Sequence, residues 1–146
     1  MKINLDCLRA VMLEIEKSAS IFVNDRYESG FISLSFPAIS AALPKYTKEE
    51  IVYSLILLDD ADFIVLMQGN ANNRIVEISV LRMTYQGHEF LNKIQDEKHW
   101  GIVKGILASV RDYSLDAITA VSTGVSAAAI EKALAGIGGN FPIISK

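Results

Sequence analysis

The amino-acid sequence predicts an α+β fold, and three observations lead to this prediction. First, an amphipathic helix is expected to begin at Thr47, because Thr47 and Glu50 have the spacing of a capping box. Second, residues 62–67 and 74–80 are β-rich runs, and the intervening QGNANN is rich in residues that favour hairpin turns. Third, Thr84 stands where it can cap another helix directly after the second run.

The residues before this region predict a helix, a short strand and a second, brief helix. Residues 4–17 carry apolar side chains at helical spacing and are expected to form one buried stripe. The polar residues 18–30 are expected to be a connector, and the partial alternation of residues 31–36 predicts a short strand. Residues 37–43 have proline in the first turn, which favours a brief helix.

Three further helices are expected after the hairpin, over residues 84–98, 100–110 and 114–134. The order helix, strand, helix, helix, hairpin and helix is typical of a winged helix-turn-helix domain, in which the small β-hairpin is the wing. We therefore expect a winged-helix-like domain over residues 1–111. A C-terminal helical extension is expected over residues 112–146.

The composition is typical of a soluble domain with a substantial core. Of the 146 residues, 51% are hydrophobic and 21% are charged. The single cysteine, Cys7, excludes a disulfide within the chain and fits a reducing compartment. Charged residues interrupt any apolar leader, and the uncharged residues 117–130 are shorter than the roughly 20 residues that span a bilayer. We expect a cytoplasmic protein without a membrane partner.

The sequence contains no motif of known catalytic or metal-binding spacing. His88 and His99 are too far apart for the helical spacing of zinc ligands. Asp59, Asp60 and Asp62 lack the glycine and the terminal glutamate of a calcium-binding loop. Nucleophile elbows, phosphate loops and dinucleotide fingerprints do not occur. We expect a non-enzymatic protein with no cofactor and no metal ion.

Four sequence blocks resemble an uncharacterised bacterial and phage-associated family, the domain of unknown function 2513. The blocks are MKINLDCLRAVMLEIE, YTKEEIVYSLILLDDADFI, LRMTYQGHEFLNKIQDEKHWGIVK and SLDAI, in this order along the chain. The third is the most specific, since Thr84, Gly87 and Trp100 stand where the family has them. The resemblance implies a winged-helix-like fold, an association with prophages or mobile elements, and no established activity.

The first expectation is a DNA-binding protein similar to a transcription regulator, with double-stranded DNA as its partner, since a winged helix can read DNA with the helix before the hairpin and touch the backbone with the wing. A net charge of −3 and the acidic entrance of that helix favour the alternative, an adaptor that binds a protein and no DNA. A map of the electrostatic surface potential would distinguish DNA binding from protein binding. The candidate DNA-contacting residues are Lys45, Tyr46, Thr47, Lys48, Tyr53 and Ser54, with Asn70, Asn72, Asn73 and Arg74 from the wing.

The last predicted helix is apolar on all sides, which indicates burial rather than exposure. Small side chains along it permit close approach of another helix. We therefore expect a homodimer that forms through this helix; the alternative is that it packs against its own chain. The candidate dimerisation residues are Ile118, Val121, Val125, Ala128, Ile130 and Leu134.

Overall fold

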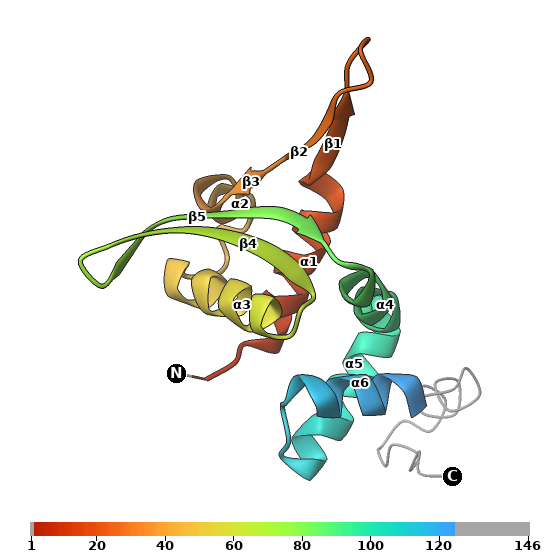
Figure 1. The fold of residues 1–146 in the computed structure, drawn as a ribbon. Coiled ribbons are helices and arrows are strands. Elements are labelled where there is room, and N and C mark those ends of the chain that lie inside the picture. Colours follow the sequence, from red (N-terminus) through yellow and green to blue (C-terminus); the bar gives the residue numbers. More distant parts are fainter. Residues whose placement is uncertain (1, 125–146) are drawn as a thin grey trace. The chain divides into compact units, whose positions relative to one another are not determined.

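The computed structural model describes residues 2–124, and the chain divides into two compact units. The first unit is Met1–Glu89 and the second begins at Phe90. The described residues form six helices and five strands, the strands in two small antiparallel sheets (Figure 1). The predicted α+β class is therefore confirmed.

The elements follow one another with short connections. The elements of the first unit are α1 (Leu5–Ser18), β1 (Ser20–Val23), β2 (Ser29–Ile32), β3 (Leu34–Ser35), α2 (Phe36–Ala42), α3 (Lys48–Asp60), β4 (Ile64–Ala71) and β5 (Arg74–Met83). Helix α4 (Tyr85–Ile94) begins in the first unit, and the second unit continues with α5 (Glu97–Val110) and α6 (Leu115–Gly124).

Helices α1 and α3 form the centre of the first unit. They pack against each other, and α3 also packs against β4. The apolar stripes predicted for the two helices are confirmed, because their side chains are buried together. Burial of each such side chain stabilises the fold by roughly 1.5–3 kcal/mol. The stripe residues are Leu5, Leu8, Met12 and Ile15 on α1 and Ile51, Leu55 and Leu58 on α3.

The predicted capping box at the start of α3 is confirmed. The Thr47 hydroxyl accepts a hydrogen bond from the Glu50 N–H at 3.1 Å, and the Glu50 carboxylate accepts one from the Thr47 N–H at 3.0 Å. Asn4 caps α1 by accepting from the Cys7 N–H at 3.1 Å. The Asn4 amide also donates to the Glu50 carboxylate, so the same carboxylate connects the starts of both helices.

The β4–β5 hairpin, which the sequence predicts to be a wing and for which we keep that name, is longer than predicted and has a tighter tip. The expected six-residue tip is wrong, because β4 and β5 stay paired as far as Ala71 and Arg74. Only Asn72 and Asn73 remain in the turn, with φ angles of 52° and 62°. Two consecutive residues with positive φ are the pattern of a type I′ turn, whose twist matches that of the strands and which asparagine tolerates.

A bulge in β5 controls which side chains share a face of the wing. Gln68 pairs with Ile78 and Asn70 pairs with Ile75, so β5 contains one more residue than β4 over this stretch. Directly paired residues lie on the same face of a sheet. Ile75 therefore extends the face on which Ile78 is buried, although the two are three residues apart.

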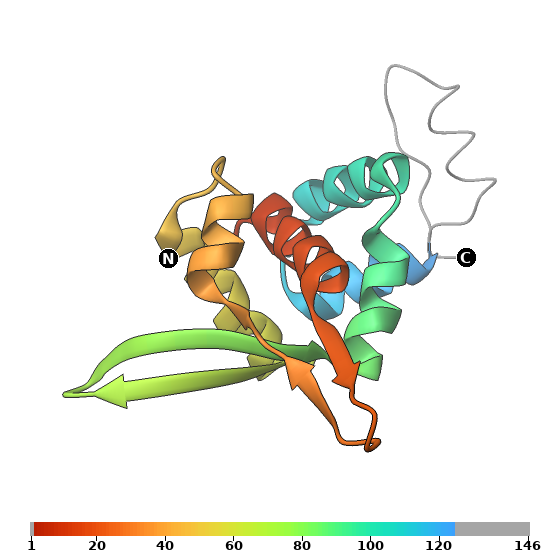
Figure 2. The same ribbon diagram turned by 90° about the horizontal axis from the view of Figure 1, so that it is seen from above.

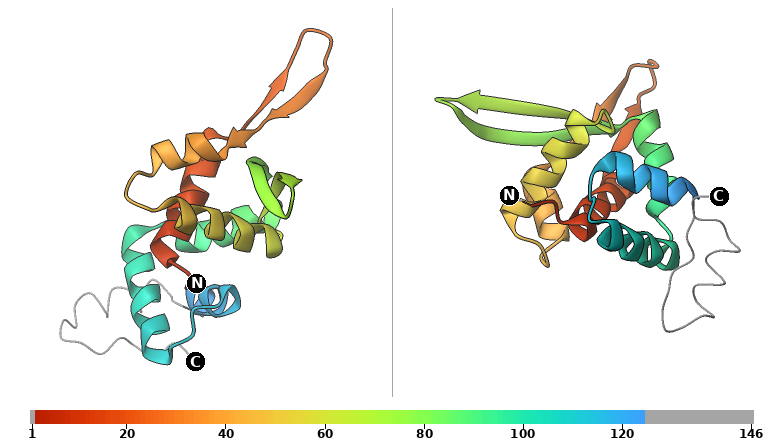
Figure 3. Two further views of the ribbon diagram at one scale, coloured as in Figure 1. Left: turned by 90° about the vertical axis from the view of Figure 1, so that its left-hand side faces the viewer. Right: turned by 90° about the horizontal axis from the view of Figure 1, so that it is seen from below.

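The predicted connector over residues 18–30 is wrong, because it forms a second hairpin. Strand β1 pairs with β2 from Ser20 opposite Ile32 to Val23 opposite Ser29. The Asn24 side chain closes the loop by accepting hydrogen bonds from the N–H groups of residues 26 and 28. Figures 2 and 3 show that this hairpin and the wing leave helices α1–α3 in different directions.

The strand predicted over residues 31–36 is divided between two sheets. Its first residues complete β2, and Leu34 and Ser35 form β3, which pairs with β5 to give the strand order β3–β5–β4. Helix α2 then begins one residue before the predicted Pro37. Its start is capped by the Ser35 hydroxyl, which accepts from the Ala38 N–H at 3.3 Å.

The helix predicted to begin at Thr84 is confirmed at its start, where the Thr84 hydroxyl accepts from the Gly87 N–H at 3.0 Å, but its predicted end at Lys98 is wrong. Helix α4 ends at Ile94, and the Asp96 carboxylate begins α5 by accepting from the His99 N–H at 2.8 Å. In the second unit α5 and α6 pack against each other. Their buried side chains include Trp100 and Ile118.

The predicted dimerisation helix is described only as far as Gly124. Ile118 is fully buried and Val121 is half-buried, whereas Val125, Ala128, Ile130 and Leu134 lie outside the described residues.

The domain boundary predicted after residue 111 falls between α5 and α6 and stays a prediction. Within residues 2–124, every helix is too short or too polar to cross a membrane.

Candidate interaction surfaces

The structure gathers half of the predicted DNA-contacting residues at the start of α3. Lys45 and Tyr46 lie in the turn before the helix, Thr47 is its N-cap and Lys48 is its first residue. The Lys45 ammonium lies 5.7 Å from the centroid of the Tyr46 ring, a cation–π distance. Tyr53 follows on the same helix and is half-exposed.

The wing candidates form a separate group on the other hairpin. Asn70 is the last but one residue of β4, Asn72 and Asn73 form the turn, and Arg74 begins β5. All four side chains are exposed. Figure 2 shows that the wing projects from the helices, so its tip is the part of this hairpin farthest from α3.

The prediction that Ser54 contacts DNA is wrong, because this residue is buried. Its side chain is only 2% exposed and lies on the buried face of α3 with Ile51 and Leu55. Its hydroxyl is hydrogen-bonded to the Cys7 thiol. Successive residues on a helix are about 100° apart, which places Ser54 inside while Tyr53 stays at the surface.

The outer face of α3 carries an apolar groove. It has a volume of about 370 Å³. Its residues come from the first two-thirds of α3 and from the first residue of α2, which the fold brings beside them. The groove is lined by Phe36, Lys48, Glu49, Val52, Tyr53 and Ile56.

Acidic side chains outnumber basic ones on α3. Lys48 is the only basic residue within its bounds, against four carboxylates. One of these, Glu50, is held in its charged form, because hydrogen bonds from the Thr47 N–H and the Asn4 amide lower the pKa of this carboxyl. The phosphate groups of DNA would therefore face a helix of net negative charge, which repels them. The carboxylates are Glu49, Glu50, Asp59 and Asp60.

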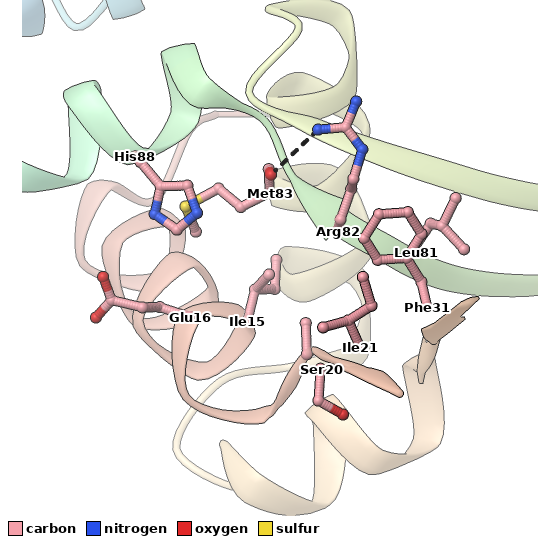
Figure 4. Close-up of a pocket in the computed structure, with 10 residues that line it drawn as sticks. Ile15, Glu16, Ser20, Ile21, Phe31, Leu81, Arg82, Met83 and His88 are labelled. Carbon is pink, nitrogen blue, oxygen red and sulfur yellow. Dashed lines mark hydrogen bonds between the residues drawn. The ribbon is translucent and has the colours of Figure 1, made fainter. Parts of the chain in front are cut away.

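A second hollow lies beside the β1–β2 hairpin, where α1, β1, β2, β5 and the start of α4 meet. Its volume is about 420 Å³. Figure 4 shows the His88 ring next to the Met83 side chain, and Arg82 near the ring of Phe31. The Arg82 guanidinium lies 5.9 Å from the centroid of that ring and donates to the Met83 carbonyl at 3.5 Å. The remaining wall residues are Ile15, Glu16, Ala19, Ser20, Ile21 and Leu81.

Sequence reasoning missed this hollow because it depends on a hairpin that was expected to be a polar connector. The available signal was Ile21-Phe22-Val23, a β-branched and aromatic run inside that connector.

Among residues 2–124, no group of three His, Cys, Asp or Glu side chains is arranged to hold a metal ion.

Comparisons with known proteins give a family but no described activity. Residues 2–112 match the family described as Hypothetical protein (DUF2513). An uncharacterized protein of Haemophilus influenzae is 31% identical over 123 residues, which are 84% of this chain and 92% of that protein. No solved structure matches the chain significantly.

Proposed function

Because the chain belongs to the family described as Hypothetical protein (DUF2513), whose description names no activity, we propose its function from its surfaces. We propose that the first unit is a winged-helix-like, non-enzymatic module that binds an apolar segment of another protein through the α3 groove. The association with prophages or mobile elements that the sequence resemblance implies stays a prediction.

The order of elements supports the winged-helix part of this proposal. Leaving out the β1–β2 hairpin, the first unit runs α1, β3, α2, α3, β4 and β5, and its sheet has the order β3–β5–β4. In this arrangement α3 precedes the wing, which is the place of the DNA-reading helix in winged-helix proteins. The outer face of α3 is therefore the surface to examine for a partner.

The apolar groove on this face is the observation that carries the proposal. Phe36, Val52, Tyr53 and Ile56 present carbon and ring surface where a DNA-reading helix would present hydrogen-bond donors. An amphipathic helix of a partner fills such a groove with apolar residues at i, i+3 or i+4 spacing. Lys48 and Glu49 add one charge of each sign to the lining. A partner segment that carries one positive and one negative residue beside its apolar residues therefore fits the groove best.

Binding of double-stranded DNA is the second candidate, because Lys45, Lys48 and Arg74 are all exposed around α3 and the wing tip. Affinity for duplex DNA depends mainly on phosphate neutralisation and falls steeply with salt. The four carboxylates of α3 oppose it. A gel shift at low salt distinguishes the candidates: the protein-binding proposal expects no retardation of a mixed-sequence duplex, and retardation that salt abolishes would favour DNA.

Site-specific photo-crosslinking in the native cells tests the protein-binding proposal. A benzophenone amino acid replaces Tyr53 in the groove, and the matched control replaces Tyr85, an exposed tyrosine on α4. We expect one protein adduct from position 53 and none from position 85. The adduct must disappear when Ile56→Glu is added, because a charge in the groove makes apolar docking unfavourable.

Two outcomes would overturn the proposal. One is an adduct that forms equally from positions 53 and 85, because it would not depend on the groove. The other is an adduct from position 53 that survives Ile56→Glu in a variant whose circular dichroism and thermal unfolding match those of the wild type.

A further inference from the structure

The hollow beside the β1–β2 hairpin has the size and the lining of a small-molecule site. Its volume of about 420 Å³ falls within the range of roughly 300–1,000 Å³ that is typical of ligand pockets. All of its wall residues belong to the first unit, and Figure 4 shows apolar side chains of α1, β1, β2 and β5 around it. Such a wall, combined with a few polar groups, suits a ligand that has an apolar body and a charged or polar end.

A second bulge in β5 determines how Arg82 lies beside this hollow. Arg82 pairs with Val65 of β4. Val80 pairs with the next residue of β4, Leu66, so Leu81 is an extra residue of β5. With regular alternation, Arg82 would lie on the same face as Val80, which is fully buried. The bulge instead leaves the Arg82 side chain exposed at the wall of the hollow, together with the residues on both sides of it.

The Arg82 guanidinium has hydrogen-bond donors left for a ligand. It donates to the Met83 carbonyl at 3.5 Å and lies 5.9 Å from the centroid of the Phe31 ring. A guanidinium has five N–H donors, so most of them are not used by the Met83 carbonyl. Within residues 2–124, no carboxylate forms an ion pair with Arg82. A carboxylate is the group that a guanidinium binds best, through two parallel hydrogen bonds.

The two other ionisable side chains of the wall are compatible with an anionic ligand. His88, in the first turn of α4, can donate a hydrogen bond from a ring nitrogen whether it is neutral or charged. Glu16 alone among the described wall residues carries a carboxylate. Figure 4 shows that this carboxylate points away from Arg82 and from the apolar residues of the wall. The hollow therefore presents donors and a positive charge, and its single negative charge is directed elsewhere.

We propose that this hollow binds a small aromatic carboxylate. Its carboxylate pairs with the Arg82 guanidinium, and its ring lies against the apolar wall formed by residues such as Ile15 and Ile21. A ring fits this wall better than an alkyl chain, because the Phe31 ring and the Met83 sulfur both make favourable contacts with aromatic groups.

This site is independent of the proposed α3 function. None of its wall residues lines the α3 groove. A failure of the photo-crosslinking experiment therefore leaves the carboxylate site open to its own test, and the reverse holds too.

Nuclear magnetic resonance titration of the full chain with 2-naphthoate tests the site. The matched ligand is 2-naphthamide, which has the same ring system and no charge. We expect saturable binding of 2-naphthoate, with the largest amide shifts in β1, β2 and residues 81–88. The amide should bind roughly tenfold more weakly, because hydrogen bonds to a charged group are the stronger ones.

Substitution of Arg82 tests the assigned role of its charge. Arg82→Gln should weaken binding of 2-naphthoate by roughly tenfold and leave that of 2-naphthamide nearly unchanged. Arg74→Gln is the matched control, because Arg74 is an exposed arginine at the wing tip and outside the hollow. It should bind both ligands as the wild type does.

Substitution of Ile21 tests the apolar wall separately. Ile21 is 59% exposed, so Ile21→Glu should leave the fold intact, which circular dichroism checks. The new carboxylate repels an anion, so 2-naphthoate should lose more affinity than 2-naphthamide.

Three results would overturn the proposal. One is equal affinity of the wild type for the two ligands, because the hollow would then be an apolar surface that does not select a charge. Another is the absence of saturable binding of 2-naphthoate at millimolar concentration. The third is an unchanged affinity of Arg82→Gln for 2-naphthoate, since the carboxylate would then lie elsewhere.

Discussion

Gly87, in the first turn of α4, lies against the backbone that precedes β4. A Cβ atom added there would lie 2.1 Å from the Phe63 carbonyl oxygen and 2.7 Å from the Met83 Cγ. The Phe63 carbonyl cannot move away freely, because it accepts a hydrogen bond from the Thr84 N–H at 2.9 Å. Glycine is required here because no side chain fits, and not because of an unusual backbone angle.

Gly87→Ala should therefore destabilise the protein by about 2 kcal/mol or more, the typical cost of forcing extra volume into a packed site. Gly101→Ala is the matched control, because nothing lies within 4 Å of an added Cβ in the interior of α5. It should stabilise by about 0.5–1 kcal/mol through helix propensity. Urea unfolding of both variants measures the difference, and equal effects would show that Gly87 is not sterically confined.

The wing is an element whose stability depends on its two-residue turn. Both Asn72 and Asn73 have positive φ, which β-branched residues adopt only with strain. Asn73→Gly should stabilise the hairpin by about 0.5–1 kcal/mol, and Asn73→Val should weaken it by about 1–2 kcal/mol. Amide hydrogen exchange of β4 and β5 is the suitable measurement, because the hairpin can open locally. Faster exchange in Asn73→Gly than in the wild type would contradict the turn assignment.

Elements with a strong local pattern could be predicted from the sequence, and elements that depend on distant partners could not. The stripes of α1 and α3 and the Thr47 cap are local patterns, so they were found at nearly the right residues. Strand β1 has three consecutive apolar residues without alternation, and its partner β2 lies beyond a polar loop. The β-branched and aromatic side chains of this run favour a strand, but without alternation and without a nearby partner this local signal is weaker than that of a helical stripe.

The α3 groove, too, could be predicted only in part from the sequence. Its position on α3 followed from the order of elements, but its chemical character did not. Phe36 joins the groove only because α2 folds beside α3, and the neighbours Tyr53 and Ser54 differ completely in exposure. A rotation of about 100° per residue decides between surface and core, and Ser54, three residues after Ile51, falls on the side of the buried stripe whereas Tyr53 does not.

At the scale of the whole molecule, the stability of the first unit should depend on pH through Glu50. Its pKa is lowered in the folded state, below the ordinary value of 4.5. A carboxyl with a depressed pKa contributes stability that is present above the unfolded value and is lost as pH falls through the folded value. Wild type should be more stable than Glu50→Gln at neutral pH, and acid should diminish the difference.

Denaturant unfolding of the two chains, from neutral pH to well below 4.5, measures this dependence. Glutamine keeps an oxygen that can accept the Thr47 hydrogen bond but loses the acceptor of the Asn4 amide, so the change of the difference with pH, rather than its size at neutral pH, reports the charge. Thr47→Ala is the control for the cap itself and should cost about 1 kcal/mol with little change over the same pH range. A constant difference between wild type and Glu50→Gln would show that the Glu50 charge is not coupled to folding.

The bulge opposite Gly69 and Asn70 has a consequence for how the wing can change during evolution. Val76 is the extra residue of β5 at this bulge, so deleting it would restore regular alternation and leave Ile75 opposite Asn70, on the same face as Ile78. Ile78 and Val80, on the body side of the deletion, would keep their places in the core. A single-residue deletion at this position would thus remove the local bend and extra twist of the hairpin without exchanging its two faces, so β5 can lose a residue here while the tip and the folded body keep their surfaces.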